Sequence, residues 1–120
     1  MIRNAEIQEL HRQAMDFAEM ALMAKHKGES EKAYDFFQQA FDKEKKSAEF
    51  FKTLMNEEPT RSVFYRSAAS LALQCQQFRE AERLIATALS GNPPFEIAEE
   101  LRELVEQLYL QWDRRLRQVG

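Results

Sequence analysis

The sequence predicts an all-α protein of about five helices, and three observations support this prediction. The chain of 120 residues has only three glycines and three prolines, while helix-favouring Ala, Leu, Glu, Gln, Lys and Arg are abundant. Apolar residues recur at steps of three and four, the period of one helix face. Glycine and proline interrupt this period at Gly28, Pro59 and Pro93. We therefore expect one domain, residues 1–120, with antiparallel helices around a single core.

The first helix is predicted from about Arg3 or Asn4 to Lys25. Its apolar residues form one stripe, whereas Glu6 and Glu9 occupy other faces. The stripe consists of Ile7, Leu10, Ala14, Phe17, Ala18, Ala21 and Leu22. Gly28 follows the helix, and its freedom to adopt a left-handed backbone conformation predicts that the helix ends there.

The second predicted helix is unusually long. It begins near Ser30 and keeps one apolar register to Met55, because no glycine or proline occurs before Pro59. At about 1.5 Å per residue such a helix reaches about 40 Å and extends several turns beyond its partner. Large apolar side chains are costly to leave in water, so we expect the C-terminal helix or another subunit to cover this extension. The side chains concerned are Phe36, Phe50, Phe51, Leu54 and Met55.

A second hairpin follows the turn around Pro59. Thr60 is predicted to cap the N-terminus of a helix over residues 61–76. A shorter helix over residues 79–90 completes the hairpin. Small and apolar residues at helical spacing let the two backbones approach closely. They are Ala68, Ala69, Ala72 and Cys75 in the first helix and Ala81, Ile85 and Ala88 in the second.

The final helix is predicted to start after Pro94 and to end near Arg117. Acidic residues at its start and basic residues at its end complement the helix dipole. Its wide apolar stripe comprises Ile97, Leu101, Leu104, Val105, Leu108, Trp112 and Leu116. We expect this helix to cap the preceding hairpin. The alternative is that it swings out or pairs with a copy of itself.

Composition and charge argue against several classes of partner. The net charge of −3 and the mixing of acidic with basic residues argue against binding to a phosphate backbone, so no nucleic acid partner is expected. The single Cys75 excludes an internal disulfide, suits a reducing compartment and is expected to be a packing residue. No apolar run is long enough for a signal peptide or a membrane span. These features predict a cytoplasmic protein without a membrane partner.

No pattern in the sequence predicts an enzyme. His11 and His26 are too far apart to form the i, i+3 or i, i+4 pair of a helical metal site. The glycines are isolated, so the sequence has no glycine-rich phosphate loop, and the serines between positions 62 and 90 have no histidine nearby in sequence. A DNA-binding helix-turn-helix at 61–89 would lack a glycine in its turn. We predict a noncatalytic protein without cofactor or metal.

Residues 62–95 resemble a tetratricopeptide repeat, a helix-turn-helix unit of about 34 residues. The matching residues are Tyr65, Phe78, Ala81, Ile85, Ala88 and Pro93. A second copy, residues 14–47, has Phe17, Ala21, Ala24, Gly28, Ala33, Phe37 and Ala40 in the corresponding positions. Both copies lack the tryptophan and the leucine–glycine pair of the family. The resemblance implies stacked antiparallel hairpins in a superhelix, with residues 95–118 as the capping helix.

The resemblance also implies a function, because the first helices of such repeats line a concave groove that holds a peptide or helix of a partner protein. We therefore predict a protein–protein interaction module, an adaptor or scaffold. The residues predicted to contact the partner are Leu22, Lys25, His26, Arg66, Ser70, Leu73 and Gln74. Leu22 and Leu73 would be semi-exposed apolar contacts, and Lys25 and Arg66 would meet an acidic group. In the alternative interpretation both charges are only solvated and both leucines touch the capping helix.

A groove made by two repeats is short, and a different class of function follows from that. In this alternative hypothesis the chain is a self-associating structural subunit without a peptide ligand. It would form a homodimer through the long helix around Phe50 to Met55 or through Trp112. A large exposed apolar patch on the monomer would favour this hypothesis.

Overall fold

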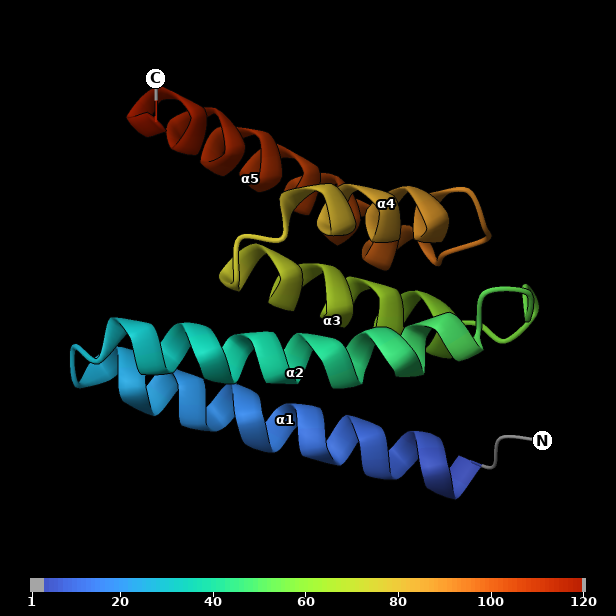
Figure 1. The fold of residues 1–120 in the computed structure, drawn as a ribbon. Coiled ribbons are helices and arrows are strands. Elements are labelled where there is room, and N and C mark those ends of the chain that lie inside the picture. The colour runs from blue at the N-terminus through green and yellow to red at the C-terminus, as the bar shows by residue number, and fades with distance from the viewer. Residues whose placement is uncertain (1–3, 120) are drawn as a thin grey trace.

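The computed structural model describes residues 4–119, and these residues form five α-helices without a strand. The helices are α1 (Asn4–His26), α2 (Ser30–Phe50), α3 (Thr60–Gln74), α4 (Phe78–Leu89) and α5 (Phe95–Val119). Each helix packs antiparallel against the helix before it (Figure 1). The all-α class and the five helices expected from the sequence are confirmed.

The helices alternate between two sides of the molecule. In Figure 1, α2 and α4 lie towards the viewer, and α5 passes behind α4. The other side belongs to α1, α3 and α5, which all run in the same direction. α3 lies between the two outer pairs and packs against α2, α4 and α5. This order leaves α1 and α5 as the two walls beside α3.

Alanines at the helix contacts allow this close packing. Most of the alanines that the helical period predicted to face a neighbour have fully buried side chains in the first two hairpins. They include Ala21, Ala40, Ala68, Ala69, Ala72, Ala81 and Ala88. Larger side chains such as Tyr65, Ile85 and Leu101 fill the remaining space of the core. Apart from Leu22 and Leu116, which are exposed, the apolar stripes predicted from the sequence lie on the packed faces of the helices.

The two hairpin turns have the same backbone geometry. Gly28 ends α1 with a φ of 80°, and Gln76 occupies the matching position after α3 with a φ of 60°. In the first turn the amide of Glu29 donates to the carbonyl of Ala24 at 2.9 Å, and in the second the amide of Gln77 donates to Ala72 at 2.8 Å. These bonds satisfy carbonyls at the ends of both helices. Glycine at position 28 was predicted for this role, but a left-handed glutamine was not.

The prediction that α2 continues to Met55 is wrong, since the helix ends at Phe50. The buried guanidinium of Arg61 donates from Nε to the carbonyl of Phe51 at 2.9 Å and from Nη2 to the carbonyl of Lys52 at 3.0 Å. A cation placed on the last carbonyls of a helix also interacts favourably with its dipole. Arg61 therefore binds the carbonyls of Phe51 and Lys52 just after the end of α2.

The side chains expected to overhang α2 are covered differently from the prediction. Phe51 is buried and its ring stacks on Phe64 of α3, with ring centroids 5.4 Å apart. Neither the C-terminal helix nor a second subunit is needed for this contact. Leu54 and Met55 lie in the loop after α2 and remain exposed.

Thr60 is not the N-cap of α3, because it is already the first residue of the helix. The carboxylate of Glu58 performs the capping instead. It accepts hydrogen bonds from the backbone amide of Ser62 at 3.0 Å and from its hydroxyl at 2.8 Å. A carboxylate at this position also complements the positive end of the helix dipole.

α5 packs on the second hairpin, as the prediction of a cap requires. Leu101 and Leu108 are fully buried in the core. Further along the helix, the ring of Trp112 stacks on the ring of Phe78, with centroids 5.8 Å apart. The guanidinium of Arg79 lies over the ring of Trp112, 5.6 Å from its centroid. α5 has 25 residues whereas α4 has 12, so its last turns extend past α4 (Figure 1).

Candidate functional site: a hollow between α1, α3 and α5

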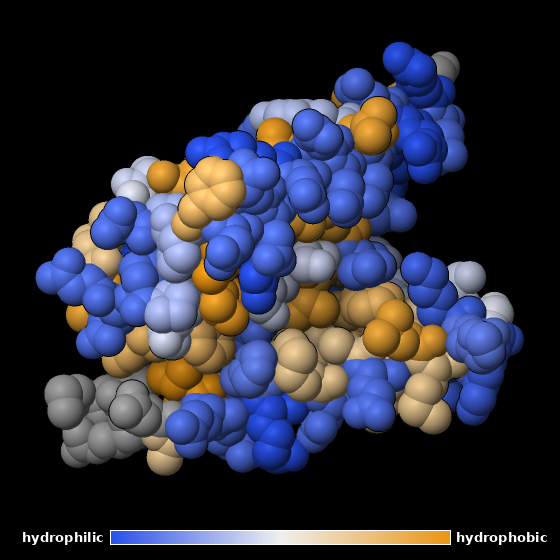
Figure 2. Space-filling model, turned by 180° about the vertical axis from the view of Figure 1, so that it is seen from behind, coloured by the Kyte–Doolittle hydropathy of each residue, from blue (hydrophilic) through white to orange (hydrophobic). Residues whose placement is uncertain are grey.

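A hollow of about 460 Å³ lies between α1, α3 and α5. Figure 2 shows this side of the molecule, with α5 above the hollow, α1 below it and apolar side chains along the lower wall. Met15 and Ala18 come from α1, Ser67 and Ser70 come from α3, and Leu104 comes from α5. The hollow thus combines apolar walls with small hydroxyl side chains on its floor.

One ion pair crosses the hollow. Nη1 of Arg66 on α3 lies 2.9 Å from Oε2 of Glu100 on α5. Both side chains are partly in water, so a pair of this kind contributes about 1 kcal/mol or less to stability. Glu103 lines the hollow as well. We predicted that Arg66 would meet an acidic group of a partner, but it has an acidic neighbour within the chain. Two carboxylates and one cation line the hollow.

Of the seven residues predicted to contact a partner, only Arg66 and Ser70 line the hollow. Leu22 is 55% exposed and follows Ala18 by one helical turn, so it extends the same face of α1 beyond the hollow. Lys25 and His26 are exposed at the end of α1, and Gln74 is exposed at the end of α3. These four side chains lie beyond the residues that line the hollow, towards the ends of α1 and α3.

The prediction for Leu73 is wrong. Its side chain is only 6% exposed and belongs to the core. Leu73 follows Ala69, which is fully buried, by one helical turn. It therefore shares the packed face of α3, is not the semi-exposed contact that was predicted, and does not line the hollow.

The wall formed by α5 was not predicted from the sequence. Glu100, Glu103, Leu104 and Gln107 line the hollow, whereas the sequence placed groove residues only on the first helices of the two repeat-like units. A signal for this wall was present in the spacing. Glu100 follows Arg66 by 34 residues, which is about the length of the repeat that residues 62–95 resemble.

A buried carboxylate lies outside the hollow. The side chain of Glu44 on α2 is 0% exposed, and its two oxygens lie 3.0 Å and 2.9 Å from Nδ1 of His11 on α1. The ring of His11 also meets the edge of Phe64 at 5.2 Å. A buried carboxylate is costly without a polar partner, so this contact makes α1 and α2 depend on each other. Among the described side chains, no group of three or more His, Cys, Asp or Glu is placed to hold a metal ion.

Cys75 is buried at the end of α3, and its Sγ lies 3.6 Å from the carbonyl of Ala72. Burial raises the pKa of this thiol to about 11. The thiolate is the reactive form of cysteine, and at neutral pH the group is protonated. Cys75 is therefore a packing residue, as the sequence indicated.

The two surfaces predicted for self-association are largely used within the chain. Phe51 stacks on Phe64, and Trp112 stacks on Phe78. What remains of the first surface is Leu54 and Met55 in the loop.

Comparison with family models, with curated proteins and with solved structures found no match to this chain. None of the described helices is both long enough and apolar enough to cross a membrane.

Proposed function

We propose that this chain is a noncatalytic protein–protein interaction module of tetratricopeptide-like architecture. Its partner segment, a peptide or a short helix, would bind in the hollow between α1, α3 and α5. The observation that carries the proposal is the hollow itself, which lies on the side shared by alternate helices and has apolar walls. The identical geometry of the turns at Gly28 and Gln76 supports a repeated unit.

The lining of the hollow suggests what the partner contains. Met15, Ala18 and Leu104 favour apolar side chains spaced along one face of a helix. Methionine adapts its shape to different partners. The second carboxylate, Glu103, favours a lysine or arginine next to the apolar face. At the far end of α1, Lys25 and His26 favour an acidic residue of the same segment.

A random peptide library displayed on phage and selected against the full chain tests this proposal. We expect the enriched peptides to carry apolar residues at i, i+3 or i+4, and i+7, with a basic residue beside them. The variant Ser70→Trp fills the hollow from an exposed position and should abolish binding of these peptides in calorimetry. Its matched control is Ala86→Trp, an exposed position on α4 outside the hollow, which should bind normally.

Glu103→Lys provides a second readout. It should weaken binding of the basic peptides and leave the thermal melting temperature unchanged, because Glu103 is exposed. If no peptide is enriched, or if Ser70→Trp binds the selected peptides as tightly as the unmodified chain, the hollow is not a peptide site.

A further inference from the structure

The last turns of α5 meet the turn between α3 and α4 at a small polar hollow of about 290 Å³. In Figure 1 this turn lies below the C-terminal turns of α5. We call the hollow the arginine pocket. Its lining consists of Gln76, Phe78, Gln111, Arg114, Arg115 and Gln118. The arginine pocket shares no lining residue with the hollow between α1, α3 and α5, so the two are separate.

α5 contributes two cations and two amides to the pocket from one face of the helix. These four residues are separated by steps of three and four. Asp113 is the only acidic residue of positions 111–118, and it lies two positions from Gln111 and from Arg115, so it faces another direction. The same positions carry three arginines, which gives them a net charge of +2 in a chain whose net charge is −3. The positive charge is therefore a local feature of this end of α5.

Other arginines of the chain already have an acidic partner. They are Arg12, Arg66, Arg83 and Arg102. Within residues 4–119, by contrast, no carboxylate forms an ion pair with Arg114 or Arg115. No described carboxylate therefore neutralises the two guanidinium groups of the pocket.

Acidic residues on α2 and α4 face other partners. Glu80 pairs with Lys45 of α2, and Glu82 accepts a hydrogen bond from the hydroxyl of Tyr109. Asp42 accepts a hydrogen bond from a glutamine of its own helix and lines a hollow between α1 and α2. These carboxylates do not line the arginine pocket.

Gln76 connects the pocket to the turn after α3. Its backbone is left-handed, with a φ of 60°, whereas Gly28 occupies the matching position of the first hairpin. Glycine adopts this conformation without steric cost, and a residue with a side chain that is held in it often belongs to a functional site. Oε1 of Gln76 accepts a hydrogen bond from Nη1 of Arg115. The strained residue thus holds one guanidinium at the pocket.

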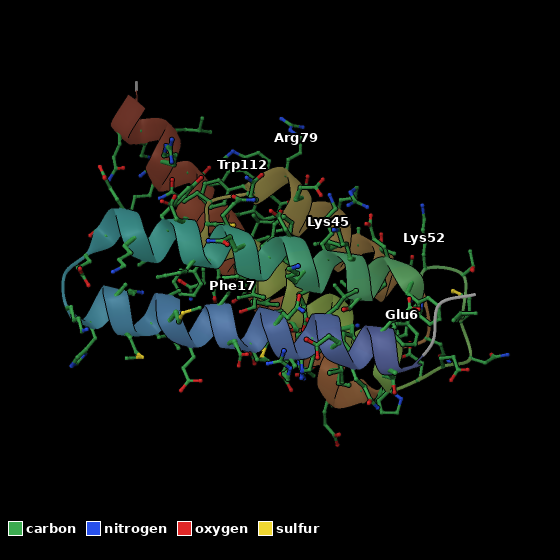
Figure 3. The ribbon with its side chains drawn as sticks, turned by 60° about the horizontal axis from the view of Figure 1, so that its bottom comes forward. Glu6, Phe17, Lys45, Lys52, Arg79 and Trp112 are labelled. Carbon is green, nitrogen blue, oxygen red and sulfur yellow. The ribbon has the colours of Figure 1, made fainter. Side chains whose placement is uncertain are left out.

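The aromatic wall of the pocket is packed against α5. Phe78 is buried and stacks on Trp112, and the guanidinium of Arg79 lies over the ring of Trp112 (Figure 3). Arg79 adds a third positive charge near the pocket. Trp112 is the single tryptophan of the chain, so its fluorescence reports on this region.

Two guanidinium groups with neighbouring amides suit an anion with several oxygens. Each guanidinium carries five N–H donors and binds a phosphate or a carboxylate in a forked pair. A carboxylate offers two oxygens, whereas a phosphate group on a side chain offers three and carries a charge of about −1.5 to −2. We propose that the arginine pocket binds a phosphate group.

The position of the pocket indicates what carries the phosphate. Gln107 lines the hollow between α1, α3 and α5, and Gln111, one turn further on the same face, lines the arginine pocket. A segment bound in the hollow can therefore place a phosphorylated side chain in the pocket. Glu103 and Arg114 are about 16 Å apart along the helix axis, which sets the separation between the basic residue and the phosphate of that segment. The carrier rests on the proposed function, whereas the phosphate site does not.

Titration of the full chain with inorganic phosphate tests the site, in about 0.15 M sodium chloride to screen nonspecific attraction. The NMR signals of the arginine Nε–Hε groups are followed together with the fluorescence of Trp112. We expect the signals of Arg114 and Arg115 to shift along a saturating curve. The signal of Arg102, which is exposed on the same helix and pairs with Glu99, should stay in place. Equal shifts at Arg102 and Arg114, or shifts that never saturate, would overturn the proposal.

Variants of the pocket give a second readout. Arg114→Gln and Arg115→Gln should each weaken phosphate binding about tenfold or more, because charge-assisted hydrogen bonds are lost. Arg102→Gln removes the same charge elsewhere on α5 and is the matched control. Gln76→Gly frees the guanidinium of Arg115 and should weaken binding about threefold, although the folded chain melts at a higher temperature. Unchanged affinity in both arginine variants, with folding confirmed by circular dichroism, contradicts the site.

The carrier is tested with a peptide from the phage selection that is extended by phosphoserine, glutamate or serine at the predicted separation. Phosphoserine should bind about tenfold more tightly than the other two, and Arg115→Gln should abolish the difference. If inorganic phosphate saturates the pocket but no peptide is enriched, the proposed function fails and the phosphate site stands. If glutamate binds as tightly as phosphoserine, or a short single-stranded DNA binds more tightly than either, the assignment to a phosphorylated protein segment is wrong.

Discussion

Gly91 leaves the space that Nη1 of Arg61 occupies, since a Cβ atom on Gly91 would overlap this nitrogen. The turn between α4 and α5 is thereby packed against the residue that ends α2. Nη1 has no hydrogen-bond partner among the described residues, whereas Nε and Nη2 bind the carbonyls of Phe51 and Lys52. Moving the guanidinium would therefore break two hydrogen bonds that hold the loop after α2.

Gly91→Ala should destabilise the fold by about 1–3 kcal/mol, because the added methyl group displaces a buried side chain. Urea denaturation followed by circular dichroism measures the change in the free energy of unfolding. In the background Arg61→Met the same substitution should cost less, since the atom that it would displace is gone. Equal costs in the two backgrounds would show that Arg61 and Gly91 do not interact.

Gln76→Gly should stabilise the chain by about 0.5–1 kcal/mol. A left-handed conformation costs a residue with a side chain about 1–2 kcal/mol, and glycine loses part of this advantage through the greater freedom of its unfolded chain. Gly28→Ala should destabilise the equivalent first turn. Thermal melting of both variants measures these effects.

The side chain of Gln76 makes a contact that Gln76→Gly would remove, so this variant needs a control. Arg115 of α5 donates a hydrogen bond to Oε1 of Gln76, and Gln76→Gly removes it. Arg115→Ala alone removes the same bond and should change stability by only a few tenths of a kcal/mol, because the pair is exposed. If Gln76→Gly melts at a lower temperature than the unmodified chain, the backbone argument fails.

Cys75 should be protected from thiol reagents in the folded protein. Its pKa is raised to about 11 by burial, so both access and thiolate formation are suppressed. Labelling with a maleimide at pH 7 should be slow and should accelerate sharply in urea at the same concentration that unfolds the helices. Rapid labelling without urea would contradict the burial of this side chain.

Stability should fall at acidic pH partly through Glu80. Hydrogen bonds from Arg83 and Lys45 lower its pKa to about 2. A carboxylate with a lowered pKa contributes stability above about pH 4.5, its value without these partners, and loses the contribution as pH falls towards about 2. Nζ of Lys45 lies 2.6 Å from Oε1 of Glu80, so this contribution links α2 to α4.

Glu80→Gln should therefore cost about 1 kcal/mol or less at pH 7, and the cost should disappear near pH 2. Urea denaturation between these pH values measures it. Glu106→Gln removes the same charge at an exposed position on α5 and serves as the control. A constant difference between Glu80→Gln and the unmodified chain at all pH values would exclude the linkage.

Sequence reasoning succeeded where structure follows from local periodicity. The spacing of alanine and phenylalanine predicted the packed faces of α1 to α4. Gly28 marked the first turn because glycine has no Cβ atom and adopts a positive φ without steric cost. Sequence reasoning failed where a structural feature depends on a contact with a residue of another helix. The end of α2 depends on Arg61, which is ten residues from Phe51, and neither proline nor glycine marks that position.

The residues of the candidate hollow fall into the same two groups, predicted and not predicted. Arg66 and Ser70 were placed on this face of α3 by the resemblance to a tetratricopeptide repeat, and both line the hollow. The acidic partner of Arg66 required the position of α5, and the burial of Leu73 required the neighbours of α3. The sequence by itself determined which residues are helical and which face of each helix is apolar, because both depend on neighbours within about four positions. Only the tertiary structure decided where α2 stops and which charge faces Arg66, because each depends on contacts between residues distant in the chain.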